Sequence, residues 1–327
     1  MSTGGAHPPA GVRIRLFVAR HRLILPIAVM FVAVLIGFGL TTDRFLSSVN
    51  VINVLRQGAP LVVVAVGVTF VLVAAGIDLS IGAMVSFTGV VTALILKAGV
   101  VPEIAVPAML LLAVAIGGLA GFLVAYQRLP SFIVTLGTLS ILVGIAQLIG
   151  QGFSIPIVTD AWLIALGQGR IGIVPVPVIV ALVVAALGWL LLNRTAYGLR
   201  IRGIGSNEES VRRSGAPVNL LVTSVYMLSA VLAAVGGLII AMRLQAGTAT
   251  AGTGLELKAI AAVVLGGTSL FGGKGTVVGS VLGVYTLAFI ENGLVLNHVD
   301  PFYFNIIQGG ILLAALWLNM GFFARMR

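Results

Sequence analysis

The chain consists largely of apolar segments, each about 20 residues long, separated by short polar or glycine-rich breaks. An α-helix rises about 1.5 Å per residue and the hydrocarbon core of a bilayer is about 30 Å thick, so such segments match a membrane crossing. Charged residues make up only 9% of the chain, against roughly 25% in a soluble domain. The sequence therefore predicts an all-α integral membrane protein and excludes a soluble enzyme or a disordered chain.

About ten segments have the length and composition of a spanning helix. They run near residues 23–40, 52–74, 80–97, 104–126, 131–149, 173–192, 218–242, 256–270, 276–296 and 303–323. The third and eighth are the weakest, because the third is short and the eighth begins with Glu256 and Lys258. We expect a cytoplasmic tail at 1–22, one transmembrane domain at 23–323 and a cytoplasmic end at 324–327.

Positive charge is unevenly distributed among the breaks, which predicts the side of the membrane that each break faces. With ten spans and the N-terminus inside, thirteen basic residues are cytoplasmic and six are outside, together the 19 Lys and Arg of the chain. The cytoplasmic set is Arg13, Arg15, Arg20, Arg22, Arg128, Arg194, Arg200, Arg202, Arg212, Arg213, Lys274, Arg325 and Arg327, and the outside set is Arg44, Arg56, Lys97, Arg170, Arg243 and Lys258. The formal net charge of +10 therefore indicates topology, with both termini cytoplasmic, and no nucleic-acid partner.

Two breaks are long. The first, near 150–172, is rich in Gly and Pro and is predicted to be a loop on the outside. The second, near 193–217, holds five Arg and the pair Glu208-Glu209 and is predicted inside. A connection between helices needs only a few residues, so the second break is where a soluble partner is expected to dock.

The order of the segments also suggests an internal repeat. Segments two to five and seven to ten form two blocks of four helices that would enter the membrane from opposite sides, as in inverted-repeat transporters. Glycine-rich breaks at 76–82 and 272–276 are expected to occupy comparable places in the two blocks. The spacings Gly117–Gly121 and Gly279–Gly283 suit close helix packing, although chance produces them often in a Gly-rich chain.

Polar residues within the apolar segments are candidates for a translocation path or gate. They are Asp78, Ser80, Thr135, Thr138, Asn292 and Gln308. For Asp78 the alternative is a helix N-cap that accepts a hydrogen bond from the amide of Ser80 or Ile81. For Ser and Thr the common alternative is a hydrogen bond within or between helices. Only Glu291 is an acid expected inside the membrane, which gives little support to ion-driven transport.

Known catalytic and metal-binding motifs are not matched. Gly273-Lys274-Gly275 fails the P-loop pattern at two positions, because residue 268 is Thr and residue 275 is Gly. The chain has no Cys, and its three His form no HExxH pattern. We therefore expect no catalytic residue, no metal and no cofactor.

Two stretches are specific in sequence: Gly76-Ile77-Asp78-Leu79-Ser80-Ile81-Gly82 is similar to the pattern GIDLSVG, and residues 130–138 are similar to PxFIVTLGT. With further segments, in order along nearly the whole chain, they resemble ribose-type permeases of ABC transporters. Residues 197–215 resemble the FG…AIGGNxxAARxSGI loop, and residues 259–268 resemble AIAAVVLGGT. Ser210-Val211 stands where two Ala are usual, and Phe271 where a small polar residue is usual.

The resemblance implies the membrane subunit of a bacterial monosaccharide importer in the inner membrane. Its partners would be cytoplasmic ATPase subunits, a periplasmic or lipid-anchored sugar-binding protein and a second permease copy, identical or related. A coupling helix to the ATPase would lie at 205–215, and its candidate residues are Gly205, Asn207, Glu208, Glu209, Arg212, Arg213 and Gly215.

Other functions remain open at this point. A permease of the same class could carry a nucleoside, an autoinducer or another small polar solute. An ATP-independent facilitator or an ion-coupled carrier would need no ATPase partner. A membrane enzyme would need a clustered catalytic set, and the sequence offers none.

Overall fold

The structure, a computed structural model, describes residues 24–300, 302–304, 306–307, 309–310 and 313. The predicted tail 1–22, the end 324–327 and most of the tenth segment, Gln308 included, lie outside the described residues. The helices are α2 (Leu25–Thr41), α3 (Ser48–Val73), α4 (Ile81–Lys97), α5 (Pro102–Ala125), α6 (Ser131–Gly150), α7 (Ala161–Gln168), α8 (Val176–Arg194), α9 (Ala196–Arg213), α10 (Val218–Leu244), α11 (Leu255–Leu265) and α12 (Val277–Leu296).

Four strands of two residues each accompany these helices. β1 (Ile155–Pro156) pairs antiparallel with β4 (Ala246–Gly247), and β2 (Arg170–Ile171) pairs antiparallel with β3 (Val174–Pro175). The predicted outside loop at 150–172 is therefore more ordered than expected, because it contains α7 and one strand of each short pair, β1 and β2. The prediction of an all-α membrane protein is confirmed by six helices long and apolar enough to cross a membrane, namely α3, α5, α6, α8, α10 and α12.

The two weak segments are short helices in the structure. α4 has 17 residues and α11 has 11. At about 1.5 Å per residue, α11 alone covers only about half of a 30 Å hydrocarbon core. The chain from β4 to α11 forms turns and no helix, so any crossing there combines a non-helical segment with a short helix.

The centre of the molecule is formed by α3 and α10. Most of the apolar stretch of each is buried, 78% in α3 and 72% in α10, against at most 50% in the other candidate spans. Small residues allow the close approach: a Cβ at Gly67 of α3 would lie 3.0 Å from Ser229 Cα of α10. Gly117 and Gly121 of α5 also face the α10 backbone, so this spacing does serve helix packing.

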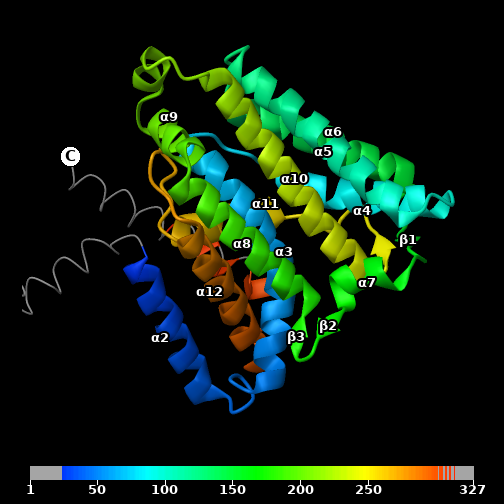
Figure 1. Ribbon diagram of the computed structural model, residues 1–327. Helices are drawn as coiled ribbons and strands as arrows, with labels where there is room; N and C mark the ends of the chain where they lie inside the picture. Colours follow the sequence, from blue (N-terminus) through cyan, green and yellow to red (C-terminus); the bar gives the residue numbers. More distant parts are fainter. Residues whose placement is uncertain (1–23, 301, 305, 308, 311–312, 314–327) are drawn as a thin grey trace, which may run out of the picture.

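The helices run between two opposite ends of the molecule (Figure 1). One end, the α9 end, holds α9, the C-terminus of α3 and the turn before α12, because Gly273 N donates to Val73 O at 2.9 Å. The opposite end, the α7 end, holds α7 and the C-terminus of α10, because Gln168 Nε2 donates to Arg243 O at 3.1 Å. α3 starts at the α7 end and α10 starts at the α9 end, so the two central helices are antiparallel.

The expected correspondence of the two Gly-rich breaks is wrong. The break at 74–80 separates the first and second helices of its block, α3 and α4, whereas 266–276 separates α11 from α12, the second and third. By order along the chain, the counterpart of 74–80 is 245–254. The break at 245–254 packs against the first turns of α4, since Gly252 N donates to Ser86 Oγ at 2.8 Å and Gly82 lies against the Gly252 backbone.

Candidate functional site

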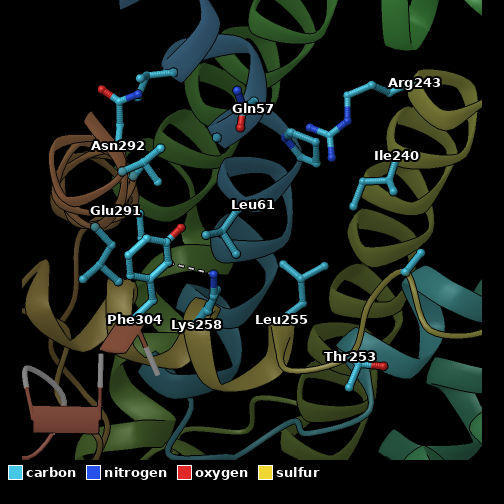
Figure 2. Close-up of a pocket in the computed structure, with 17 residues that line it drawn as sticks. Gln57, Leu61, Ile240, Arg243, Thr253, Leu255, Lys258, Glu291, Asn292 and Phe304 are labelled. Carbon is cyan, nitrogen blue, oxygen red and sulfur yellow. Dashed lines mark hydrogen bonds and ion pairs between the residues drawn. The ribbon is translucent and has the colours of Figure 1, made fainter. Parts of the chain in front are cut away.

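A polar cavity of about 530 Å³ lies between α3, α10, α11 and α12 (Figure 2). Its polar lining comes from Gln57, Arg243, Thr253, Lys258, Glu291 and Asn292. Arg243 belongs to the last turn of α10 and Gln57 to the first half of α3. Because α10 ends and α3 begins at the α7 end, the cavity belongs to the half of the molecule nearer that end.

An ion pair crosses one wall of this cavity. Lys258 Nζ, in the first turn of α11, donates to Glu291 Oε1 of α12 at 2.7 Å, with 36% and 35% of the two side chains exposed. Sequence analysis identified Glu291 as the intramembrane acid but assigned Lys258 only to the outside face. An acid and a base within neighbouring apolar segments were the signal for pairing, because isolated charges at membrane depth are costly.

Asn292 lines the same cavity, but its amide is committed to a structural contact. Asn50 Nδ2 donates to Asn292 Oδ1 at 2.7 Å, and Asn292 Nδ2 donates to Asn50 Oδ1 at 3.0 Å. The reciprocal pair fastens the start of α3 to α12. The predicted path role of Asn292 therefore rests on its position in the cavity wall, not on a free amide.

Three other predicted path residues meet in a second place, around the break between α3 and α4. Asp78 is 4% exposed. Its Oδ1 accepts from Ser80 N at 3.0 Å and Ser80 Oγ at 2.6 Å, and its Oδ2 accepts from Ser229 Oγ of α10 at 2.7 Å. The bond from the Ser80 amide is the one the cap interpretation predicted, although α4 itself begins after Ser80 as N-cap.

Thr135 joins this cluster and Thr138 does not. Thr135 Oγ1 lies 3.3 Å from Ile77 O, and Ser131 Oγ accepts from Ile77 N at 3.1 Å, so α6 holds the break from one side. The Thr138 hydroxyl instead donates to Val134 O within its own helix at 2.9 Å. The break is thus anchored to α6 and α10, and no described contact links Thr138 to it.

The predicted coupling residues lie on α9 and just after it, at the α9 end. The backbone of α9 leaves helical geometry at Asn207 (φ −163°, ψ 95°), so the element is two helices in sequence. Asn207 Oδ1 accepts from Ser210 N at 3.0 Å, which caps the second helix. The expected coupling helix at 205–215 is therefore shorter, beginning at Glu208, and Gly215 follows it with φ +82°.

The second helix of α9 carries its charges in matched pairs. Arg212 pairs with Glu208, and Arg213 Nε lies 3.0 Å from Glu209 Oε1. The acids stand in the first turn and the bases in the last, an arrangement that complements the helix dipole. More than half of each Glu side chain is exposed, so both carboxylates are accessible to another protein.

The first helix of α9 is attached directly to the transmembrane part. A Cβ at Gly205 would overlap the Val73 carbonyl oxygen at the end of α3, so only glycine permits this contact. Arg202 Nη1 donates to Gly275 O at 2.9 Å, just before α12 begins. This helix buries polar groups at the contact: burial lowers the pKa of Arg202 and raises the pKa of the Tyr197 phenol. The Tyr197 hydroxyl also lies 2.9 Å from Ser224 Oγ of α10. α9 therefore directly contacts the end of α3, the turn before α12 and α10.

Comparison with known proteins identifies the kind of molecule that carries this arrangement. Residues 50–316 match the family described as branched-chain amino acid transport system / permease component. The chain is 39% identical over 284 residues to the ribose import permease RbsC of Escherichia coli strain K12, covering 85% of this chain and 88% of that protein.

Two further relatives in the same strain carry other sugar names. The D-allose transport system permease AlsC is 36% identical over 294 residues, with 89% of each chain covered. The xylose transport system permease XylH is 34% identical over 351 residues, with 88% of this chain and 89% of that protein covered. No solved structure matches the chain. The chain is therefore a multi-pass membrane protein of the transport-system permease family, and it belongs to the ribose-type monosaccharide ABC permeases that its sequence resembles.

Proposed function

We propose that the chain is the membrane-spanning subunit of an ABC importer that moves a monosaccharide of the ribose, xylose or allose kind into the cytoplasm by alternating access. The named relatives support this substrate class, since each aligns with more than four fifths of the chain. ATP hydrolysis resides on a separate ATPase subunit in this proposal, so the chain itself is not an enzyme.

One observation carries the proposal: a polar cavity and a charged docking helix lie in opposite halves of one helical body. The cavity offers uncharged groups, the ion pair of Lys258 and Glu291 and the Arg243 guanidinium near the α7 end, and α9 offers exposed charges at the other end. Both contact α3, at Gln57 and at Val73 respectively. A partner that moves α9 can therefore change the access of the cavity through the same central helix.

The proposed topology has ten crossings in the bacterial inner membrane, with both termini and the 193–217 segment cytoplasmic. The separation of charges supports it. Among described residues, the predicted cytoplasmic bases lie toward the α9 end and the predicted outside bases toward the α7 end. In this topology residues 1–22 and 324–327 are cytoplasmic, and residues 23–323 form the single transmembrane domain.

An inverted repeat is part of the same proposal. α3 and α10 each open a block, each is the longest helix that the structure describes in its block, and they run antiparallel. Each is followed by a non-helical break, at 74–80 and 245–254. The helix that follows each break, α4 or α11, is shorter than the helix before it. This order, long helix then break then short helix, is what two inverted copies of one unit would produce.

The partners follow from the two ends. ATPase subunits are proposed at Glu208, Glu209, Arg212 and Arg213, and a periplasmic or lipid-anchored sugar-binding protein at the α7 end. A second permease copy, identical or related, completes the transmembrane part within the lipid bilayer.

The test is reconstitution in liposomes with the ATPase and the binding protein encoded beside this chain. We expect the sugar-loaded binding protein to stimulate ATP hydrolysis and ATP-dependent uptake of one of the three labelled sugars. Liposomes without the ATPase subunit serve as the control. Uptake that persists without ATP would establish a facilitator, and stimulation only by a nucleoside or an autoinducer would replace the sugar as substrate.

A further inference from the structure

We infer that the polar cavity between α3, α10, α11 and α12 is a solute subsite within a single copy, and that it binds neighbouring hydroxyl groups of a neutral monosaccharide. The inference rests on the proposed function and adds the residues and the ligand chemistry. Such a subsite differs from an open path without binding, because groups able to hydrogen-bond a sugar lie on opposing walls of the cavity.

Arg243 supplies donors on one wall. Its side chain extends from α10 toward α3, on the opposite side of the cavity from Glu291 (Figure 2). Within the part of the chain that the structure describes, no hydrogen bond or ion pair of its guanidinium is formed. A guanidinium carries five N–H donors in a planar fork and suits two adjacent oxygen atoms.

Glu291 supplies an acceptor on the other wall. Lys258 uses its Oε1, whereas Oε2 has no hydrogen-bond partner among residues 24–300 or the other described positions. Lys258 has further N–H donors beside the one used. The opposing walls therefore present to the same space donors and an acceptor that no residue of the described ranges uses.

A hydroxyl group fits this combination better than a charged group does. A hydroxyl both donates and accepts, so adjacent hydroxyls can accept from Arg243 and donate to Glu291. An anionic solute could pair with Arg243 but would also meet the Glu291 carboxylate, and a cationic solute would meet Arg243 and Lys258, whereas a neutral solute meets no like charge. Gln57 and Thr253, which are uncharged, add both donors and acceptors to the lining.

The rest of the lining suits the carbon skeleton of a sugar. Leu61, Ile240 and Leu255 face the cavity between the polar groups (Figure 2), and they offer apolar surface to the C–H face of a pyranose or furanose ring. The volume of about 530 Å³ lies within the range of about 300–1,000 Å³ found for small-molecule pockets. A pentose or a hexose therefore has room without excluding water entirely.

The test uses the absence of cysteine from the natural chain. Thr253→Cys, or Gln57→Cys if the first variant is not assembled, places a single thiol in the cavity of the full-length permease in nanodiscs. We expect D-ribose, D-xylose or D-allose to slow its modification by N-ethylmaleimide at least threefold at saturation. Ile173→Cys, on an exposed residue of the β2–β3 turn, is the control whose modification no sugar should slow.

A second substitution identifies the donor. Combined with Thr253→Cys, Arg243→Met should raise the sugar concentration needed for half protection about tenfold, the effect of losing a charge-assisted hydrogen bond. Arg170→Met, which removes an exposed cation outside the cavity, should leave that concentration unchanged.

The inference and the proposed function fail in different ways. If no sugar slows modification of the cavity thiols while ATP-dependent sugar uptake is intact, the importer stands and the subsite is wrong. Protection by D-ribonate and not by D-ribose would also overturn the inference, because the site would then select an anion.

Discussion

At the scale of single residues, Asp78 has the most constrained environment of the predicted path residues. Ser80 and Ser229 direct three donors at its carboxylate, and these donors join the break after α3 to α10. A buried carboxylate that accepts several hydrogen bonds is costly to replace, because its donors then lose their partner away from water. This environment favours a structural role in which Asp78 fixes the shape of the break.

We expect Asp78→Asn to lower the yield and thermal stability of the assembled permease more than it alters the choice of sugar. The amide has one acceptor oxygen where the carboxylate has two, so either Ser229 or Ser80 faces an NH₂ group. The loss is about 1–3 kcal/mol in folding free energy. Thermal unfolding of the purified protein, followed by size-exclusion fluorescence, measures it.

Asp160→Asn is the matched control, because Asp160 is exposed and its side chain makes no capping hydrogen bond. An Asp78→Asn protein that assembles normally and prefers a different sugar would reverse this interpretation in favour of a path residue.

At the scale of elements, α9 combines rigid attachment with accessible charge. Its first helix packs on α3 through Gly205, and its second helix, capped by Asn207, presents Glu208 and Glu209. Exposed ion pairs four residues apart contribute only about 0.3–0.5 kcal/mol each. The stability of the protein therefore depends little on these charges, which is compatible with the proposed role in recognition of a partner.

We expect Glu208→Arg combined with Glu209→Arg to abolish ATP-dependent transport and to leave membrane insertion intact. The exchange puts four bases on a short helix and reverses the charge at its N-terminus, where acids are favoured. Co-purification of the ATPase and uptake in liposomes are the two measurements.

A fourfold variant separates recognition from helix stability. Adding Arg212→Glu and Arg213→Glu restores both ion pairs in reversed order. If coupling depends on acids at 208 and 209, the fourfold variant stays inactive, and normal transport by either variant would show that this assignment is wrong.

At the scale of the whole molecule, the two ends differ in what they offer. The α9 end carries the most polar helix, and the α7 end carries short strands and a Gly-rich loop (Figure 1). An importer needs this asymmetry, because one face meets an ATPase and the other a delivery protein.

Single cysteines test the direction of insertion. We expect Ser210→Cys, on the second helix of α9, to react with a membrane-impermeant maleimide only after the bacterial membrane is opened, and Ile173→Cys to react in intact spheroplasts. Both positions are exposed, so in permease expressed without its proposed partners, accessibility is decided by sidedness. Labelling of both positions from the same side would contradict the proposed topology.

Features of the fold that are set within one segment were predictable from the sequence, and features set by contacts between distant segments were not. Apolar segments of spanning length were identified from sequence because hydrocarbon thickness sets their length locally. Helix ends were shifted by a few residues, and α7 within 150–172 was missed because it has only eight residues in a Gly-rich segment. The short length of α11 could not be predicted in this way, because α11 and the break before it contact α4, which is distant in sequence.

Site residues divide in the same way. Asp78, Ser80 and Thr135 could be proposed from polarity within apolar segments, but Thr138 has the same polarity three residues along and bonds only within α6. Nothing in the local sequence marked Arg243 or Gln57 as a site residue, because a charged or amide side chain near a helix end is ordinary. Their shared cavity exists only because α10 ends beside the first half of α3.

The sequence by itself determined that this chain is a multi-pass membrane protein, which family it resembles and which segment is polar enough to meet a soluble partner. These properties depend on composition and on the order of residues within single segments. The bilayer imposes its requirement for an apolar helix on each spanning segment separately. Only the tertiary structure decided which polar residues meet. Contacts such as Asp78 with Ser229, Lys258 with Glu291 and Gly205 with Val73 join residues far apart in the chain, and helix packing alone brings them together.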